Sequence, residues 1–397
     1  MRYNRGKENV IEGDVMRILL APDSFKESLS AQGVAEALAR GFEKSQLDCQ
    51  LVSLPLGDGG EGTVAALVAS LGMTYQDLEV TGPFGQPCQL TYAVKDDLAL
   101  VEMAELVGLA KIPLDQRNPL RVSTFGLGQL LVHLAEAGYK RVMVGVGGSA
   151  SNDGGLGMAA GLGYEFFDIS GHKLQPLGSN LEKVARISDA AVPNQIKELE
   201  LTLITDVTNP LCGPQGATYV FAGQKGLPEA DFARVNQAMQ AFYQLANPAI
   251  FDLAGAGAGG GMAAGLVTFA GGQLVSGIDA ILDLLDFDQK VKQVDLVLVG
   301  EGRMDGQSLA GKAPIGVARR TPAGIPVIAI CGSLKDDLPD FPVENIVAAF
   351  PIIPQLDSLE NTLASASQNL ERTACNVGNL LALSHGNKSR PIASRII

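Results

Sequence analysis

The sequence predicts a two-domain α/β protein in which a Rossmann-like, doubly wound domain carries a second α/β domain as an insertion. The chain has 397 residues, which exceeds the usual size of one domain. Apolar residues make up 46% and aromatic residues only 5%, a composition that suits parallel sheets of aliphatic side chains covered by helices. Short apolar runs also alternate with helical segments, which is the rhythm of a right-handed parallel sheet.

The first elements of this rhythm lie near the N-terminus. Arg17–Asp23 is an apolar run that ends in Pro and Asp, as a buried strand would. A helix is expected next, with Ser28 or Ser30 as its N-cap. Cys49–Leu56 predicts a second strand, and a glycine-rich turn then opens a second helix.

The pattern changes in the middle of the chain. From about Tyr75 to Leu100 polar residues alternate with apolar ones, and Gly and Pro residues interrupt the pattern. This predicts antiparallel or mixed strands. A new α/β stretch follows, with a helix around Leu127–Ala137 and strands at Arg141–Gly147 and Leu199–Asp206. We expect this stretch to form the inserted domain.

The last third returns to the first style and is expected to complete the first domain. Strands are predicted at Asp295–Gly302, Pro326–Gly332 and Asn345–Ile352, and one long helix around Ser358–Leu383. The predicted divisions are a disordered extension at 1–15, the Rossmann-like domain at 16–88 plus 288–385, the inserted domain at 89–287, and a C-terminal tail at 386–397.

Charge and composition exclude several classes of protein. The formal net charge of −13 argues against nucleic acid or an anionic membrane surface as the main partner. No segment reaches the roughly 18 uninterrupted apolar residues of a membrane span, and the polar N-terminus does not resemble a signal peptide. The five scattered cysteines suit free thiols in a reducing compartment, so a cytoplasmic protein is expected.

Glycine is unusually abundant, with 47 residues, and it clusters where predicted strands end. Ligands in open α/β sheets collect beyond the carboxyl ends of the strands. Five strand ends here combine glycine with acidic, hydroxyl or basic residues, and each is a candidate part of a site.

The first two motifs follow the first two strands. In Asp23-Ser24-Phe25-Lys26, Lys26 offers a charge for phosphate, and Asp23 or Ser24 could bind a metal or a substrate hydroxyl; a solvated turn is the alternative. In Gly57–Gly62, backbone N–H groups can converge on an anion. Asp58 there could accept a proton from a substrate hydroxyl, or flank Mg²⁺; a tight turn is again the alternative.

The third motif, Gly147–Gly155, follows a strand and opens a helix. Small hydroxyl residues and bare backbone at a helix start are typical of phosphate binding, and Asp153 is available for a metal. Neither the dinucleotide fingerprint nor the Walker pattern occurs in it. The candidate cofactor contacts are Gly147, Gly148, Ser149, Ser151 and Asn152.

The last two motifs also contain acidic residues. Asp206, in Thr205–Pro210, is either a metal or substrate ligand or part of a turn. Gly300–Pro314 places two acids, an Arg and a Lys after a strand, a set that is costly to bury without a ligand unless it forms a structural ion-pair network. By contrast, the three histidines have no metal spacing, and the glycine run Gly255–Gly261 follows no convincing strand, so it is a weak dinucleotide fingerprint. An inventory rich in Asp, Lys, Gly and hydroxyl groups favours a small-molecule kinase or a related Mg²⁺-dependent phosphate enzyme.

The same residues also resemble a known family. APDSFKESLSA, PLGDGGEGT, TGPFGQP, GGSASNDGG, TDVTNPLCGPQGA and GEGRMDGQSLAGKAP, in this order, are similar to the bacterial glycerate kinase family, type 1 (GarK-like), from about Met16 to Leu383. The resemblance implies ATP-dependent, Mg²⁺-requiring phosphorylation of D-glycerate at the 2-hydroxyl, in a cleft between the two domains. Gly57, Ser151 and Ser308 depart mildly from the family pattern without removing an ionisable group.

Residue chemistry within that resemblance suggests roles. Asp58 or Asp206 would orient or deprotonate the glycerate hydroxyl, and the Gly147–Ser151 segment would bind the ATP phosphates. The glycerate carboxylate and the transferring phosphoryl group would be bound by Lys26, Lys312 and Arg303. Further substrate contacts are expected from Asp23, Ser24 and Glu301, and Mg²⁺ contacts from Asp153 and Asp305. An NAD-dependent oxidoreductase of a small hydroxy acid and a non-catalytic metabolite-binding protein are the alternatives, and the chain is expected to be a monomer or a homodimer.

Overall fold

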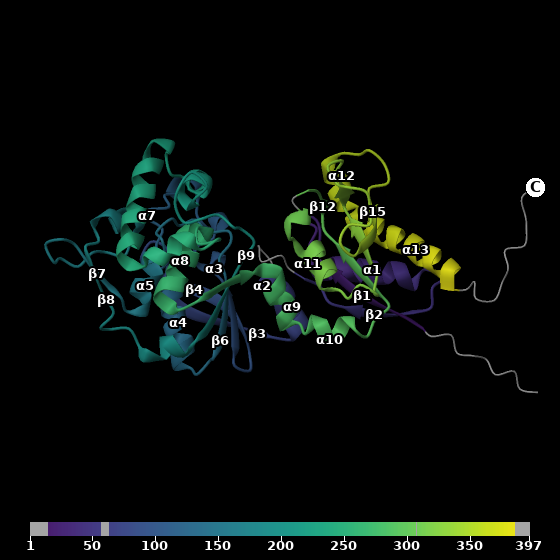
Figure 1. Cartoon of the computed structure of the whole chain (residues 1–397), viewed down its shortest axis with the longest axis horizontal. Coiled ribbons are helices and arrows are strands. Elements are labelled where there is room, and N and C mark those ends of the chain that lie inside the picture. Colours follow the sequence, from purple (N-terminus) through teal and green to yellow (C-terminus); the bar gives the residue numbers. More distant parts are fainter. Residues whose placement is uncertain (1–14, 57–62, 307, 386–397) are drawn as a thin grey trace, which may run out of the picture. The chain divides into compact units, whose positions relative to one another are not determined.

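A computed structural model describes residues 15–56, 63–306 and 308–385 and divides into two compact units. Unit 1 takes its described residues from 15–55, 286–310 and 314–385, and unit 2 from 56–285 and 311–313. Unit 2 is therefore inserted into the sequence of unit 1, and both are α/β structures (Figure 1). The predicted fold class is confirmed. The predicted extension at 1–15, apart from Val15, and the predicted tail at 386–397 lie outside the described residues.

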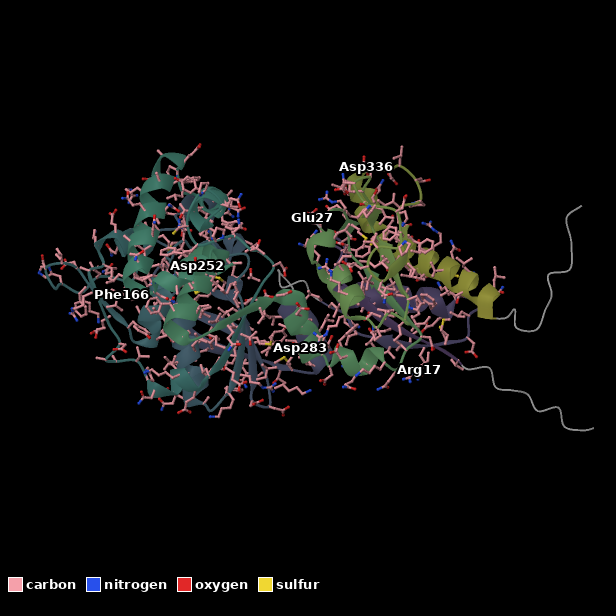
Figure 2. All side chains as sticks on the ribbon, in the orientation of Figure 1. Arg17, Glu27, Phe166, Asp252, Asp283 and Asp336 are labelled. Carbon is pink, nitrogen blue, oxygen red and sulfur yellow. The ribbon has the colours of Figure 1, made fainter. Side chains whose placement is uncertain are left out.

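Unit 1 contains a parallel five-stranded sheet. Its strands, in spatial order, are β15 (Ile346–Pro351), β13 (Val327–Cys331), β11 (Leu296–Gly300), β1 (Met16–Pro22) and β2 (Cys49–Ser53). Strand β1, purple in Figure 1, pairs in parallel with β11, which comes from the far end of the sequence; Ile18 is in register with Leu296. At the start of this pair the backbone N–H of Arg17, labelled in Figure 2, donates to Asp295 Oδ2 at 2.7 Å.

The strand order of unit 1 reverses direction between β1 and β11. Counted within the unit the order is 2-1-3-4-5, the flavodoxin-like version of a doubly wound sheet. Every residue of β11 and β13 is buried, which explains their unbroken aliphatic sequences. These strands lack the alternation of polar and apolar residues because both of their faces are buried.

The helices of unit 1 begin and end largely as the sequence indicates. Helix α1 (Ala31–Glu43) is capped by Ser30, whose Oγ accepts from the backbone N–H of Gly33 at 3.1 Å. The single C-terminal helix predicted over 358–383 is wrong, because the backbone leaves helical geometry at Ser365 (φ −91°, ψ 0°). The remaining helices of unit 1 are α10 (Phe287–Val291), α11 (Ala313–Arg320, whose first residue is assigned to unit 2), α12 (Leu359–Ala364) and α13 (Ala366–His385).

Unit 2 contains a mixed six-stranded sheet. In spatial order its strands are β10 (Gln273–Ser276), β9 (Glu200–Thr205), β6 (Arg141–Gly145), β5 (Leu98–Glu102), β4 (Pro87–Lys95) and β3 (Thr74–Thr81). The first four are mutually parallel, and β4 and β3 are antiparallel to their neighbours. The parallel strands follow one another in a single direction, so right-handed crossovers place their helices on one face. Those helices are α4 (Phe125–Glu136), α5 (Leu156–Leu162) and α8 (Ala258–Ala270).

The first predicted domain boundary, at residue 88, is wrong. Strands β3 and β4 form an antiparallel pair from Thr74↔Val94 to Thr81↔Pro87, and a boundary at 88 would cut through β4. The chain enters unit 2 at Leu56 instead. The return to unit 1 comes at Asp286, two residues before the predicted 288.

Aromatic side chains fill one end of the unit 2 core. Phe166, labelled in Figure 2, packs edge-to-face on Phe269 with ring centroids 6.1 Å apart, and Phe242 lies 5.9 Å from Phe166. Such pairs add directional contacts to ordinary apolar burial. All five cysteines are free thiols. Within the described residues, no helix has the length and apolar character needed to cross a membrane.

Candidate functional site

The carboxyl edge of the unit 1 sheet carries the first motif and the beginning of the fifth. Asp23 directly follows β1, and its backbone N–H donates at 2.8 Å to the carbonyl oxygen of Gly300, the last residue of β11. The strand order reverses between these two strands, and open α/β sheets bind ligands at such a switch point. Two motifs from opposite ends of the sequence are thus neighbours.

Close backbone contacts hold the turns at this edge. A Cβ atom on Gly302 would lie 3.4 Å from Phe25 Cα, so the segment after β11 lies against the segment after β1. A Cβ atom on Gly332, after β13, would collide with the carbonyl oxygen of Gly302. The Gly332 N–H also donates to the Glu301 carbonyl oxygen at 3.0 Å. Glycine at position 332 is therefore required for this approach.

The predicted substrate-binding residues of unit 1 gather here. Asp23 and Glu301 are each only 6% exposed, whereas Lys26 and Arg303 are exposed. The carboxylate of Asp23 is held by its neighbour, since the Ser24 backbone N–H donates to Asp23 Oδ1 at 2.6 Å. Buried acids next to exposed cations suit a small ligand that carries both a carboxylate and hydroxyl groups.

Asp305 follows in the same segment and is fixed by its surroundings. Its Oδ1 accepts from the backbone N–H of Ser308 at 3.1 Å and from Ser308 Oγ at 3.3 Å, and its Oδ2 pairs with Arg303 Nε at 3.4 Å. The residue is 9% exposed. Lys312, half-buried, directly precedes α11.

Unit 2 contains a pocket of about 600 Å³ at the carboxyl ends of β5, β6 and β9. Its wall includes Glu102 at the end of β5, Gly147–Ser149 just after β6, and Thr205 at the end of β9. The volume lies within the range of small-molecule sites, roughly 300–1,000 Å³. Leu109 and Phe221 give the pocket an apolar side.

The Gly147–Ser149 segment is held in place by backbone hydrogen bonds. The Leu109 N–H donates to the Gly148 carbonyl oxygen at 2.8 Å, and the Ala150 N–H donates to the Val107 carbonyl oxygen at 2.7 Å. Gly148 has φ +69°, a conformation that favours glycine. The segment therefore presents backbone and a hydroxyl to the pocket in a fixed position.

Of the five predicted cofactor contacts, Gly147, Gly148 and Ser149 line the pocket and two do not. Ser151 and Asn152 are fully buried, and Asn152 Nδ2 donates to Thr218 Oγ1 at 3.1 Å. Both residues support the segment from within the unit.

The glycine run Gly255–Gly261, a weak dinucleotide fingerprint in the sequence, forms another part of the same wall. Gly259, a pocket residue, and its two successors have φ values of +66°, +71° and +85°. A Cβ atom on Gly260 would collide with the Ser151 carbonyl oxygen and lie 2.9 Å from Asn152 Cα. The two glycine-rich segments are thus packed backbone to backbone.

Lys225 is a pocket residue that the sequence motifs do not contain. It is 3% exposed, lines the pocket, and donates from Nζ to Ser149 Oγ at 2.9 Å and to the Ser151 carbonyl oxygen at 2.8 Å. Burial lowers its pKa to about 7, and the negative charge of Asp153 partly opposes this. In sequence it belongs to Gly-Gln-Lys-Gly, which resembles an ordinary exposed turn.

Two other cations line the pocket and have different partners. Lys111 Nζ, on an exposed side chain, pairs with Glu105 Oε2 at 2.6 Å. Arg117 is part-buried, and its guanidinium donates to the carbonyl oxygens of Leu109 at 2.9 Å and Ile112 at 3.2 Å.

The fourth motif also reaches the pocket. Asp206 is exposed and follows β9 between Thr205 and Val207, both of which line the pocket. The second motif, with the predicted base Asp58, lies outside the described residues. The helix after it, α2 (Thr63–Leu71), starts beside the pocket residue Glu102, because the Val64 backbone N–H donates to Glu102 Oε1 at 3.0 Å.

The position of Asp153 does not fit the predicted metal ligand. The residue is fully buried, and its carboxylate accepts from Thr124 Oγ1 at 2.7 Å, the Gly155 N–H at 3.0 Å and the Gly157 N–H at 3.2 Å. Burial raises its pKa although these donors oppose the shift. Asp153 thus fastens the start of α5 and has its oxygens occupied by protein donors. Across 15–56, 63–306 and 308–385, no group of three His, Cys, Asp or Glu residues could hold a metal ion.

Comparisons with known proteins agree with one another. Residues 18–382 match the model of the glycerate kinase family. The chain is 55% identical over 366 residues to a glycerate kinase of Neisseria meningitidis serogroup B, covering 92% of this chain and 99% of that one. It is 37% identical to the glycerate 2-kinase of Escherichia coli K12, covering 93% and 98%. The crystal structure of a candidate glycerate kinase 2 from Salmonella typhimurium LT2 superposes with a TM-score of 0.84 at 39% identity, covering 94% of this chain and all of that one.

Proposed function

Because the chain belongs to the glycerate kinase family, we propose that it transfers a phosphoryl group from ATP to D-glycerate, with the 2-hydroxyl as acceptor. The observation that carries the proposal is the 600 Å³ pocket of unit 2, whose wall combines a fixed glycine-rich segment, a buried lysine and an apolar side. The choice of hydroxyl follows the name of the Escherichia coli relative.

The nucleotide is assigned to this pocket. Bare backbone at Gly147 and Gly148, with the Ser149 hydroxyl, supplies donors for phosphate oxygens. Leu109 and Phe221 supply an apolar surface that suits a purine base.

Glycerate is assigned to the carboxyl edge of the unit 1 sheet. The exposed cations Lys26 and Arg303 suit its carboxylate, and the arginine can do so through two N–H donors at once. The buried acids Asp23 and Glu301, with Ser24, suit its hydroxyl groups.

In phosphoryl transfer the protein contributes mainly by positioning the reacting groups and by stabilising the negative charge of the transferring phosphoryl group. Asp206 is proposed to orient the acceptor hydroxyl or take its proton, supported by its exposure and by the pocket residues on either side of it. Asp58 stays an equal candidate from sequence. Lys312 is proposed to stabilise the transferring phosphoryl group as a point charge.

Magnesium is proposed to enter with ATP as the Mg·ATP complex, in which it neutralises phosphate charge. Asp305 stays the proposed protein contact of the ion, and binding there would have to compete with the Ser308 donors and Arg303 that its carboxylate already has as partners. Removal of Mg²⁺ with EDTA is expected to abolish turnover, and added MgCl₂ to restore it.

A direct assay separates this function from its rivals. The purified protein is incubated with D-glycerate, ATP and MgCl₂ while ADP is followed, and then with D-glycerate and NAD while NADH absorbance is followed. Glycerate-dependent ADP release without NADH is expected. NADH formation would support the oxidoreductase, and ligand binding with neither product would support a metabolite-binding protein.

A further inference from the structure

Lys225 differs from the other two cations of the unit 2 pocket in its contacts. Lys111 is neutralised by the Glu105 carboxylate, and Arg117 is part-buried against two backbone carbonyls. The Lys225 ammonium, by contrast, is almost fully buried and donates to a hydroxyl and a carbonyl, both uncharged. Among the described residues no carboxylate forms an ion pair with it.

The nearest compensating charge acts at a distance. Asp153 attracts Lys225 electrostatically, but its own oxygens accept from Thr124, Gly155 and Gly157. An ammonium has three N–H donors, and the described contacts of Lys225 use two of them. A buried cation on a pocket wall is costly until an anion enters the pocket and offsets its desolvation.

We propose that Lys225 binds the phosphate groups of the nucleotide, together with the backbone of Gly147–Ser149. The link between the two is Ser149, whose hydroxyl accepts from Lys225 while its backbone lines the pocket. This inference rests on the proposed kinase function, since it takes the unit 2 pocket as the ATP site. It adds a binding residue that none of the five motifs contains.

Phosphate binding at Lys225 has a signature that a structural lysine lacks. Burial lowers the pKa of Lys225 to about 7, so at pH 8 the neutral form predominates in the free protein. A phosphate partner favours the charged form and raises this pKa, so binding takes up a proton. The other charged groups on the pocket wall, the carboxylates of Glu102 and Glu105 and the cations Lys111 and Arg117, stay the same in a Lys225 variant, and Asp153 stays buried.

The test is calorimetric titration of the protein with ADP and MgCl₂, without glycerate, at pH 8 in buffers of different ionisation enthalpy. The wild-type protein is expected to take up close to one proton per ADP. Lys225→Met, which keeps side-chain length and removes the cost of burying a charge, is expected to bind ADP at least tenfold more weakly and without proton uptake. Lys225→Arg stays charged at every accessible pH, so it too is expected to bind without uptake.

Lys173→Met is the control, because Lys173 is an exposed lysine of unit 2 that pairs with Glu165 at 2.7 Å and does not line the pocket. It is expected to keep wild-type proton uptake and to change ADP affinity less than threefold. ADP affinity and proton uptake that are unchanged in Lys225→Met would overturn the inference, as would uptake that persists in Lys225→Arg. Lys225-dependent ADP binding in a protein that never phosphorylates glycerate would instead uphold this inference and refute the proposed substrate.

Discussion

The packing of the two glycine-rich segments of unit 2 predicts a specific cost for one methyl group. Gly260 has φ +71°, and a Cβ atom there would collide with the backbone of Ser151 and Asn152. The left-handed backbone costs a non-glycine residue about 1–2 kcal/mol. Forcing extra volume into a packed site adds about 1–3 kcal/mol. Gly260→Ala is therefore expected to lower the free energy of unfolding of unit 2 by about 2–5 kcal/mol.

Gly271→Ala is the matched control. Gly271 follows the same helix, α8, and has nearly the same backbone angle, φ +69°, but nothing lies within 4 Å of its Cβ position. This variant should lose only the backbone cost of about 1–2 kcal/mol. The difference between the two variants in urea unfolding, followed by far-UV circular dichroism, then measures the collision alone.

The same collision has a functional consequence. Relief of the clash requires the Ser151 segment to move, and the Ser151 carbonyl is one of the two acceptors of Lys225. ADP affinity is expected to fall in Gly260→Ala and to stay normal in Gly271→Ala. Equal stability losses in the two variants would refute the packing of Gly255–Gly261 against the Gly147–Gly155 motif.

Three further predictions concern both units. Tyr243→Phe removes a buried hydroxyl that donates to the Gly154 carbonyl oxygen at 2.6 Å, and it should lower the free energy of unfolding in urea by about 1–2 kcal/mol. An unchanged midpoint of the urea transition would contradict this hydrogen bond. Burial lowers the Lys225 pKa to about 7, below its value in the unfolded chain, so the unfolded state binds more protons above pH 7. The wild type should therefore gain stability relative to Lys225→Met as pH rises from about 7 towards 10. An equal pH slope in both proteins would contradict that burial. Arg303→Ala should raise the KM for glycerate about tenfold and leave ADP affinity unchanged. Arg319 is an exposed arginine paired with Glu344, and Arg319→Ala should change neither quantity. A normal glycerate KM in Arg303→Ala would remove Arg303 from the site.

Much of the fold could be predicted because it depends on local pattern. The apolar runs that became β1, β6, β11 and β13 are short, aliphatic and bounded by glycine or charge, and Ser30 caps α1 as expected. The domain boundary could not be read in the same way. The β3–β4 pair belongs to unit 2 because β4 pairs with β5 of the unit 2 sheet. This pairing is a tertiary contact, and no residue between Leu56 and Thr74 indicates it in the sequence.

The sequence could predict which candidate site residues follow neighbouring strands of unit 1, whereas their roles stay predictions. Asp23, Glu301 and Arg303 lie on segments that follow neighbouring strands, because parallel strands end at one edge of a sheet, and the strand-end positions already implied this. Asp153 was misjudged because a carboxylate beside glycines resembles a ligand, whereas its oxygens are filled by Thr124 and two backbone N–H groups. Lys225 was missed because the burial of a lysine depends on tertiary packing and leaves no mark in a Gly-Gln-Lys-Gly turn.

The central claim is tested most directly by identifying the product. The protein is incubated with D-glycerate and Mg·ATP, and the mixture is followed by phosphorus NMR. The account predicts the growth of a 2-phosphoglycerate resonance in step with ADP, its absence without glycerate, and its strong reduction in Lys225→Met at limiting ATP. ATP consumption without any phosphoglycerate, or no reaction in a folded protein that binds both ligands, would contradict it.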